Sequence, residues 1–440
     1  MNPRQLAIQI LSRMEKSDAY ADILLTQELR KHNLSDLDKA LVMELVNGTL
    51  RWRRKLQWIL EQLYEGNWKK CPRLIRYILE VSLYQLLFLE KIPDYAAVNE
   101  GVVLARRLGS SYWANKVNGI LRNFIRRKNE IRFPSLSENP VQAISVIYSH
   151  PQWLVERWLT RFGIEETEKL CQANNQTPLV TLRVNRLKTT PNALLKLLSE
   201  HGIEASFSQY LPDFLKVKNL PDLSRFEPFS NGLFTVQDES AGLVGILVNP
   251  EPGDTIIDLC SAPGGKATHL AELMGDKGTI LAVDRNFNRL NLVRENYQRL
   301  GLQSLHRVQA DATYFFSKKA DKVLIDAPCS GLGVLAKRSD LRWRRTPEDI
   351  QTLAELQFRL LNNAASLLLK GGVLVYSTCT LEPEENEAVV ERFLARNQNF
   401  HIVEAGRFIP SALLDSQGYV RTFPHKHQMD GSFAVRMIKH

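Results

Sequence analysis

The stretch IIDLCSAPGGKATHLAELM, from Ile256 to Met274, predicts a strand, a glycine-bearing turn and a helix in direct succession, with the helix beginning near Lys266. Glycines let the backbone approach a ligand closely, and the free N–H groups of a helix N-terminus can donate to acceptor atoms. In open α/β sheets the ligand crevice lies at the carboxyl ends of the strands, so this turn is a candidate cofactor site. It matches neither the G-x-G-x-x-G dinucleotide pattern nor the P-loop, which counts against NAD and ATP.

The same alternation of strand and helix continues along the chain. Short apolar runs begin at residues 255, 279, 322 and 372, with the sequences TIIDLC, TILAVD, KVLIDA and GVLVYST, and a helical segment follows each of them. This pattern is typical of βαβ units, so it predicts an α/β domain with a mostly parallel, doubly wound sheet.

Acidic residues follow three further strands of this predicted sheet. Asp284 ends the second strand, where a carboxylate can accept hydrogen bonds from a ribose diol, and Asp311 and Asp326 follow the next two strands. Each acidic strand end taken alone also fits a loop cap. Three of them in sheet order, beside a glycine turn, favour a bound nucleoside. The arrangement resembles the S-adenosylmethionine site of Rossmann-like class I methyltransferases.

Length, composition and charge limit the class of protein. A chain of 440 residues predicts two or three domains, and 44% hydrophobic and 24% charged residues are typical of a globular protein. No run approaches the roughly 18 apolar residues of a membrane span. Five scattered cysteines and no export signal at the N-terminus predict a cytoplasmic protein without a disulfide framework.

The basic excess is confined to the N-terminal third. Residues 1–135 hold 23 Lys and Arg against 14 Asp and Glu, which accounts for the whole net charge of +9, whereas the remaining residues hold 34 of each. Concentrated positive charge favours a polyanionic partner, with nucleic acid the first candidate. A solvated helical domain that happens to be basic explains the charge equally well.

Three domains are predicted. Residues 1–135 show helical periodicity and almost no strand pattern, so they predict an all-α domain, with Gly48, Gly101 and Gly119 punctuating the helices. A polar stretch containing a proline marks the first boundary. Residues 140–235 mix helices and strands and predict a small α+β linker or RNA-binding module, and residues 236–440 hold the α/β domain.

Two of the cysteines follow strands at the predicted functional edge of the sheet. Cys329 follows Asp-Ala-Pro, and Cys379 lies within Ser-Thr-Cys-Thr. A thiolate that adds to carbon 6 of cytosine makes carbon 5 nucleophilic enough to accept a methyl group, and a base must then remove the carbon-5 proton before the cysteine leaves. One thiol would attack and the other could serve the release, but spacing does not assign the roles. Cys71 and Cys171 are expected to be buried small side chains, and Cys260 to pack in the glycine turn.

The motifs CSAPGGK, DAPCSG and STCTLEPEEN, in this order and spacing, resemble the Sun/Fmu family of RNA cytosine-5 methyltransferases. The resemblance implies that Cys379 is the nucleophile and that Cys329 assists breakdown of the covalent adduct. It implies that Lys266 and Asp326 also face the target base. The residues expected to bind S-adenosylmethionine are Cys260, Ser261, Ala262, Pro263, Gly264, Gly265, Lys266, Asp284, Asp311 and Asp326.

The resemblance covers the whole chain, with a NusB-like N-terminal domain, a middle module containing LRVNRLKTT and a C-terminal catalytic domain. It implies a monomer that methylates 16S rRNA, usually the cytosine at position 967, either as free RNA or within a small-subunit assembly intermediate. Three alternatives stay open. They are the same chemistry on tRNA or another rRNA cytosine, a NusB-like RNA-binding protein with an inert methyltransferase domain, and a small-molecule methyltransferase.

Two basic and aromatic segments are candidate RNA contacts. Residues 336–345 combine four arginines and a lysine with Trp343, whose indole could stack on an unpaired base, although a surface loop with a half-buried tryptophan fits as well. Residues 51–58 have the spacing of a helix with one buried side, so core and RNA roles stay equally open. His425 and His427 lack the further ligands of a zinc site, so no metal is expected.

Overall fold

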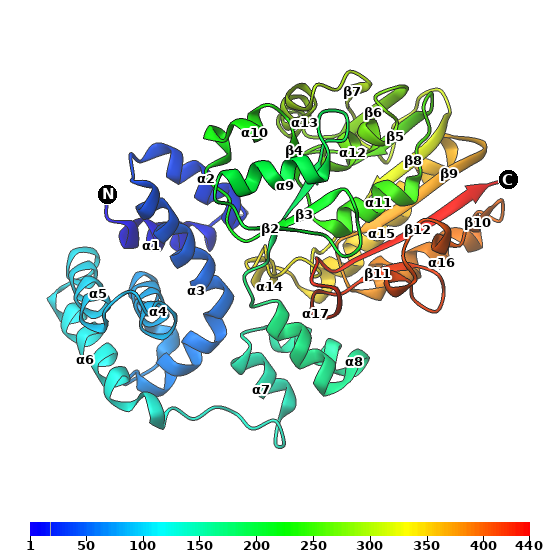
Figure 1. Ribbon diagram of the computed structural model, residues 1–440. Coiled ribbons are helices and arrows are strands. Elements are labelled where there is room, and N and C mark those ends of the chain that lie inside the picture. Colours follow the sequence, from blue (N-terminus) through cyan, green and yellow to red (C-terminus); the bar gives the residue numbers. More distant parts are fainter. Residues whose placement is uncertain (18) are drawn as a thin grey trace. The chain divides into compact units, whose positions relative to one another are not determined.

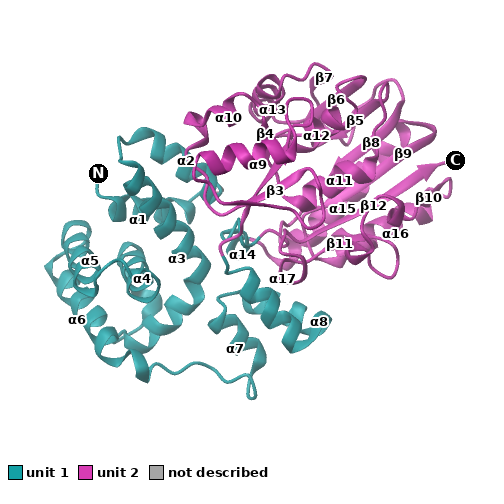
Figure 2. Ribbon diagram, in the orientation of Figure 1, with its two compact units in different colours: residues 1–176, 335–344 teal, residues 177–334, 345–440 magenta. Residues whose placement is uncertain are grey.

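The computed structural model describes residues 1–17 and 19–440 and groups the chain into two compact units (Figures 1 and 2). The first unit comprises residues 1–176 and 335–344, and the second comprises residues 177–334 and 345–440. The boundaries of the three domains expected from the sequence stay a prediction. None of the helices among the described residues combines the length and the apolar character needed to cross a bilayer.

The first unit is helical, which confirms the all-α prediction. Proline at the first helical turn and side-chain caps from Asn2, Ser35, Ser110 and Asn139 start several of its helices. Its helices are α1 (Pro3–Met14), α2 (Ala21–Lys31), α3 (Asp36–Leu63), α4 (Arg73–Phe88), α5 (Asp94–Leu108), α6 (Ser111–Arg127), α7 (Pro140–Ile147), α8 (Gln152–Ala173) and the short α14 (Leu341–Arg344). Helix α8 is two helical segments joined at Gly163, whose φ of 78° breaks the helix.

The prediction that three glycines punctuate this domain is wrong, because each lies inside a helix. Gly48 lies within α3, and a Cβ atom there would be 2.1 Å from Tyr84 Cζ. Gly101 lies within α5, where a Cβ atom would be 2.5 Å from Ser82 Oγ, and Gly119 lies within α6. The first two glycines therefore allow neighbouring helices to approach closely, which local propensity does not reveal.

Residues 335–344 pack into the first unit. Arg342 has no exposed surface and donates to the backbone oxygens of Ser149 and Asn174 at 3.0 and 3.1 Å. The Trp343 indole N–H donates to the backbone oxygen of Leu50 at 2.6 Å, and the ring packs against the hydrophobic core of the unit. The structure therefore favours the half-buried tryptophan over an indole free to stack on RNA.

The second unit begins with a small antiparallel sheet in the order β2-β3-β1-β4, which confirms the expected α+β module. Its elements are β1 (Val180–Val184), α9 (Pro191–Glu200), β2 (Ala205–Phe207), β3 (Phe214–Val217), α10 (Glu227–Ser230) and β4 (Phe234–Val236).

A larger sheet of eight strands follows, in the order β10-β12-β9-β8-β5-β6-β7, with β11 paired to β12. The run from β9 to β7 is parallel, as predicted, whereas β10, β11 and β12 add an antiparallel side. The strands are β5 (Thr255–Leu259), β6 (Thr279–Asp284), β7 (Leu305–Gln309), β8 (Ala320–Asp326), β9 (Leu368–Thr378), β10 (Phe400–Ile402), β11 (Val420–Thr422) and β12 (Ser432–Lys439). The helices are α11 (Glu239–Val248), α12 (Gly265–Leu273), α13 (Phe287–Leu300), α15 (Pro347–Ser366), α16 (Glu387–Arg396) and α17 (Pro424–His427).

The strand order reverses between β5 and β8. Right-handed crossovers then place α12 and α13 on one face of the sheet and α15 on the other. Two separate hydrophobic clusters confirm this arrangement of the helices. Leu270 of α12 and Val293 of α13 belong to one cluster together with α11, whereas Leu361 of α15 and Phe393 of α16 belong to the other. The carboxyl ends of β5, β6, β8 and β9 meet at one edge, which is where a doubly wound sheet binds its ligand.

Candidate active site

The two cysteines singled out in the sequence meet at this edge of the sheet. Strands β8 and β9 pair in parallel, with Asp326 opposite Ser377, so the segments that follow them leave the sheet side by side. The sulfur atoms of Cys329 and Cys379 are 3.2 Å apart, and the backbone N–H of Cys379 donates to the sulfur of Cys329 at 3.3 Å. Both thiols are free and partly exposed. Two sulfurs from distant parts of the chain can therefore act on the same substrate atom or its neighbour.

A buried network of hydrogen bonds connects the two loops that carry Cys329 and Cys379. The Glu385 carboxylate accepts the backbone N–H of Ser330 at 2.8 Å and the side-chain amide of Gln357 at 3.0 Å. The hydroxyls of Ser330 and Thr380 are 2.7 Å apart, and the Asn386 side chain donates to the backbone oxygen of Thr380 at 3.1 Å. No catalytic or supporting role was predicted for these residues, although Glu385 and Asn386 lie in the motif STCTLEPEEN.

Two glycines let three backbone segments cross beside Cys379. The Gly333 N–H donates to the Cys379 oxygen at 3.0 Å, and the Gly431 N–H donates to the Gly333 oxygen at 2.8 Å. A Cβ atom on Gly333 would lie 2.0 Å from the Gly431 oxygen, so no other residue fits there without movement. This crossing ties the two cysteine loops to the segment before β12.

The two sulfurs do not share the same electrostatic surroundings. The hydrogen bond with Cys379, burial and the negative charges of Cys379 and Glu385 together raise the pKa of Cys329 well above its ordinary value. Burial likewise raises the pKa of the Glu385 carboxyl. Cys329 therefore keeps its proton at neutral pH and can donate a hydrogen bond to the sulfur of Cys379.

The glycine turn forms a compact loop between β5 and α12. Cys260 and Gly264 adopt positive φ angles of 65° and 97°. The Ser261 hydroxyl donates to Asp258 at 2.8 Å, and the Ala262 N–H donates to Asp284 at 3.2 Å. Helix α12 begins directly after this loop, at the second glycine of the turn. The loop residues expected from the sequence thus lie together at the edge of the sheet, and Pro263 lies between them.

Three carboxylates converge beside this loop. Burial, together with the charges of Asp326 and Asp284, raises the pKa of Asp258 to about 7, against the opposing effects of the Ser261 hydrogen bond and the Lys266 charge. One Asp258 oxygen is buried and has no hydrogen-bond partner among the described residues. A ligand with hydroxyl donors and positive charge would satisfy this acidic group, and S-adenosylmethionine has both. The structure does not bring Asp311 into it, because this exposed carboxylate accepts from the backbone and hydroxyl of Thr313 instead.

Lys266 links the loop to the cysteine pair. Its ammonium lies 2.8 Å from the Asp326 carboxylate. Burial disfavours its charge, but the negative charges of Asp326, Cys379 and Asp258 outweigh burial and raise its pKa. Lys266 therefore stays charged between the glycine loop and Cys379.

A buried arginine anchors the loop to the small sheet. Arg183 of β1 donates to both carboxylate oxygens of Glu272 on α12, at 3.0 and 2.9 Å, and to the backbone oxygen of Gly265 at 2.7 Å. Both charged side chains are almost fully buried. The sequence did not identify this residue, because its partners lie more than 80 positions away.

Three family models match successive parts of the chain. The NusB family matches residues 1–126, the ferredoxin-like domain of RsmF/B-like methyltransferases matches residues 150–223, and 16S rRNA methyltransferase RsmB/F matches residues 245–438. Together they bear out the helical, α+β and methyltransferase parts expected from the sequence.

Full-length relatives carry the same name. The chain is 40% identical over 446 residues to the probable ribosomal RNA small subunit methyltransferase B of Synechocystis, which spans 100% of both chains. It is 36% identical over 443 residues to the probable enzyme of the same name from Bacillus subtilis, which spans 99% of this chain and 98% of that protein.

Two crystal structures share the fold. The structure of PH0851 matches with a TM-score of 0.83 and 26% identity, over 100% of this chain and 99% of the other. The structure of NSun6 from Pyrococcus horikoshii with SFG, an S-adenosylmethionine analogue, matches with a TM-score of 0.60 and 29% identity, over 66% of this chain and 98% of the other. The chain belongs to the ribosomal RNA small subunit methyltransferase B family, whose methyl donor is S-adenosylmethionine.

Proposed function

We propose that the protein methylates carbon 5 of a cytosine in 16S rRNA, with Cys379 as the nucleophile and Cys329 acting in the release step. The observation that carries this proposal is the 3.2 Å separation of the two sulfurs beside the cofactor loop. A small-molecule methyltransferase would need neither thiol. The family supports small-subunit rRNA as the substrate, and we assign the cytosine at position 967 as the target.

The reaction needs the cytosine to be unpaired or extruded, so that its ring can reach the sulfur. The Cys379 thiolate forms a bond to carbon 6, and the electrons of the carbon 5–carbon 6 double bond make carbon 5 nucleophilic. Bound at the Cys260–Lys266 loop, S-adenosylmethionine would supply the methyl group, whose bond to the sulfonium sulfur breaks as its bond to carbon 5 forms, which leaves S-adenosylhomocysteine. Asp326 holds Lys266 in place at 2.8 Å, and the pair can hydrogen-bond the edge of the base.

Release requires loss of the carbon-5 proton, after which the ring electrons reform the double bond and expel the Cys379 thiolate. Before the reaction, the hydrogen bond with Cys379 is the first cause of the raised pKa of Cys329. Once the Cys379 sulfur is bonded to carbon, it carries neither proton nor charge. That cause then disappears, so Cys329 ionises more readily and can accept the carbon-5 proton.

We assign the methyl-donor site to the loop from Cys260 to Lys266, together with Asp284 and Asp326, and leave out Asp311, whose carboxylate accepts from Thr313. Asp284 is the candidate partner of the ribose hydroxyls, because its two oxygens each accept a single backbone N–H and a carboxylate has room for more. Asp258 joins this set because one of its carboxylate oxygens is buried and has no hydrogen-bond partner among the described residues. We further propose that the protein acts in the cytoplasm as a monomer, on free 16S rRNA or an assembly intermediate.

The first test compares wild type, Cys379→Ala and Cys329→Ala on unmodified 16S rRNA with labelled S-adenosylmethionine, followed by denaturing gels. Cys329→Ala should accumulate a protein–RNA adduct, whereas Cys379→Ala should give neither adduct nor methylated RNA. Methylation by Cys379→Ala would show that the nucleophile is wrongly assigned. Label on tRNA but not on rRNA would preserve the chemistry and change the substrate. RNA binding by wild type without methylation or adduct would instead indicate an inert catalytic domain.

A further inference from the structure

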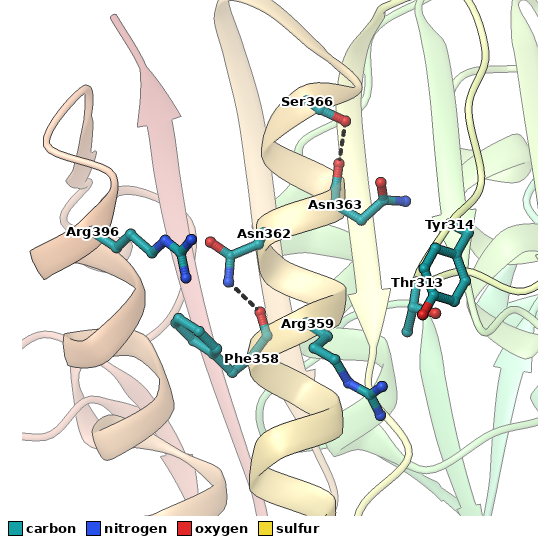
Figure 3. Close-up of a pocket in the computed structure, with 8 residues that line it drawn as sticks. All are labelled: Thr313, Tyr314, Phe358, Arg359, Asn362, Asn363, Ser366 and Arg396. Carbon is teal, nitrogen blue, oxygen red and sulfur yellow. Dashed lines mark hydrogen bonds between the residues drawn. The ribbon is translucent and has the colours of Figure 1, made fainter.

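The connection between β7 and β8, residues 310–319, contains no helix, whereas α12, α13 and α15 fill the other crossovers of the parallel strands. Since right-handed crossovers put this connection on the same face as α15, a helix is missing beside α15. A pocket of about 410 Å³ lies there (Figure 3). It is lined by Thr313, Tyr314, Phe358, Arg359, Asn362, Asn363, Ser366 and Arg396.

The connection is ordered by contacts with α15. The Asn363 side-chain amide donates to the backbone oxygens of Ala312 and Phe315 at 2.8 and 2.9 Å. Phe315 is buried in the hydrophobic cluster that α15 shares, with 9% of its surface exposed. The rings on either side of it, Tyr314 and Phe316, are 77% and 88% exposed. An ordered loop therefore presents two large aromatic side chains to solvent, and one of them, Tyr314, lines the pocket.

The pocket is also basic. Arg359 and Arg396 line it, and none of its lining residues is acidic. No hydrogen bond or ion pair joins either guanidinium to another described residue, although Arg359 interacts electrostatically with the carboxylate of Asp311. Nearby Arg392, in contrast, is paired with Glu355. Figure 3 shows Arg359 extending from α15 on the side of Tyr314, and Arg396 on the opposite side of the helix. Exposed lysines at positions 318 and 319 continue the basic surface.

We propose that this pocket binds one single-stranded nucleotide of the RNA substrate, with Arg359 and Arg396 serving its flanking phosphates and Tyr314 stacking on its base. The proposal rests on the proposed function, since it gives the same rRNA a second contact outside the cysteine site. Arginine pairs with phosphate oxygens through its planar fork, and aromatic rings stack on bases of any sequence. An acidic protein segment would use the charges but not the flat exposed ring.

The pocket is joined by hydrogen bonds to Asp311, which lies on the same connection between β7 and β8. Thr313 lines the pocket, and its backbone N–H and hydroxyl both donate to Asp311, at 2.9 and 2.7 Å. RNA held in the pocket would therefore contact the same connection that carries Asp311, within the unit that holds the two cysteines.

The test measures binding of full-length protein to unmodified 16S rRNA transcript over a range of salt concentrations. A double Arg359→Ala, Arg396→Ala variant should reduce the salt slope of log K by about 1.4, the value for two single-strand phosphate contacts. Tyr314→Ala should weaken binding roughly tenfold, and Tyr314→Phe should restore it. A double Lys169→Ala, Arg225→Ala variant is the control, because it removes two exposed cations that have carboxylates within 2.7 and 4.0 Å.

In activity assays, the pocket variants should raise the KM for rRNA, because the residues that they change bind the substrate. Binding by the pocket variants equal to that of the control would overturn the proposal. Normal binding to free rRNA with lost activity on small-subunit particles would also overturn it and assign the pocket to a protein partner. If wild type makes no 5-methylcytosine but the pocket variants still lose RNA affinity, the proposed function fails and the pocket assignment stands.

Discussion

Replacing Gly333 with alanine tests whether the backbone crossing beside Cys379 fixes the site. The added Cβ atom would lie 2.0 Å from the Gly431 oxygen and 2.9 Å from the Cys379 oxygen. Normal contacts of this kind are about 3.5 Å, so one segment must move by more than about 1 Å. The two backbone hydrogen bonds of Gly333, to Cys379 and from Gly431, cannot both survive that movement.

Overpacking of this size costs about 1–3 kcal/mol, and a lost backbone hydrogen bond costs about 1 kcal/mol more. We therefore expect Gly333→Ala to lower the free energy of unfolding by about 3 kcal/mol. For a unit of this size that corresponds to a Tm lower by about 6–12 °C. A displacement of about 1 Å at Cys379 should also reduce the rate of methyl transfer about 100-fold.

Thermal unfolding and adduct formation, measured on the same preparation, check both expectations. Gly406→Ala is the matched control, because the nearest atom to its Cβ would be 3.5 Å away, an ordinary contact. If Gly333→Ala has the same Tm as Gly406→Ala and forms the adduct at the wild-type rate, the backbone crossing does not position Cys379.

Three further changes probe the buried charges. Glu385→Gln removes a negative charge that raises the pKa of Cys329, so the pH profile of adduct breakdown should move to lower pH in single-turnover assays. Arg183→Met leaves Glu272 buried without its partner, which should cost about 3–5 kcal/mol in denaturant unfolding, and a second change of Glu272→Leu should recover much of it. Asp258 has a pKa of about 7 when folded and a lower one when unfolded, so the folded state binds more protons and stability falls as pH rises between about 4 and 7. Asp258→Asn should flatten that fall in unfolding curves recorded without the methyl donor.

The parts of the fold that the sequence predicted are those that local patterns determine. Apolar runs such as TIIDLC and KVLIDA became parallel strands, because a strand buried on both faces needs a continuous apolar stretch. Gly48 failed as a helix boundary because its function is a contact with Tyr84, which is 36 positions away and on another helix. The sequence left the half-buried and RNA-stacking alternatives for Trp343 open for the same reason, since its partner at Leu50 lies in a distant part of the chain.

The residues of the candidate site likewise fall into those that local patterns predict and those that depend on contacts between distant parts of the chain. Residues at strand ends could be predicted together, because parallel strands bring their carboxyl ends to one edge whatever the details of packing. Asp311 shows the limit of that rule, because a strand end fixes where the chain turns and not where the side chain points. Glu385 and Gly333 could not be found this way. They position the two cysteine loops through hydrogen bonds to residues that are distant in the sequence.

The asymmetry around the two sulfurs bears on which thiol attacks, a question that spacing left open. A nucleophile must give up its proton before attack, whereas a group that acts in the release step can keep its proton until then. Glu385 lies on the side of Cys329 and, with burial, disfavours the thiolate there, whereas the Lys266 ammonium interacts with negative charge on Cys379. The charges of Glu385 and Lys266 agree with the proposed attack by Cys379. Changing both, with Glu385→Gln and Lys266→Met together, should make Cys329 react faster with alkylating reagents at neutral pH.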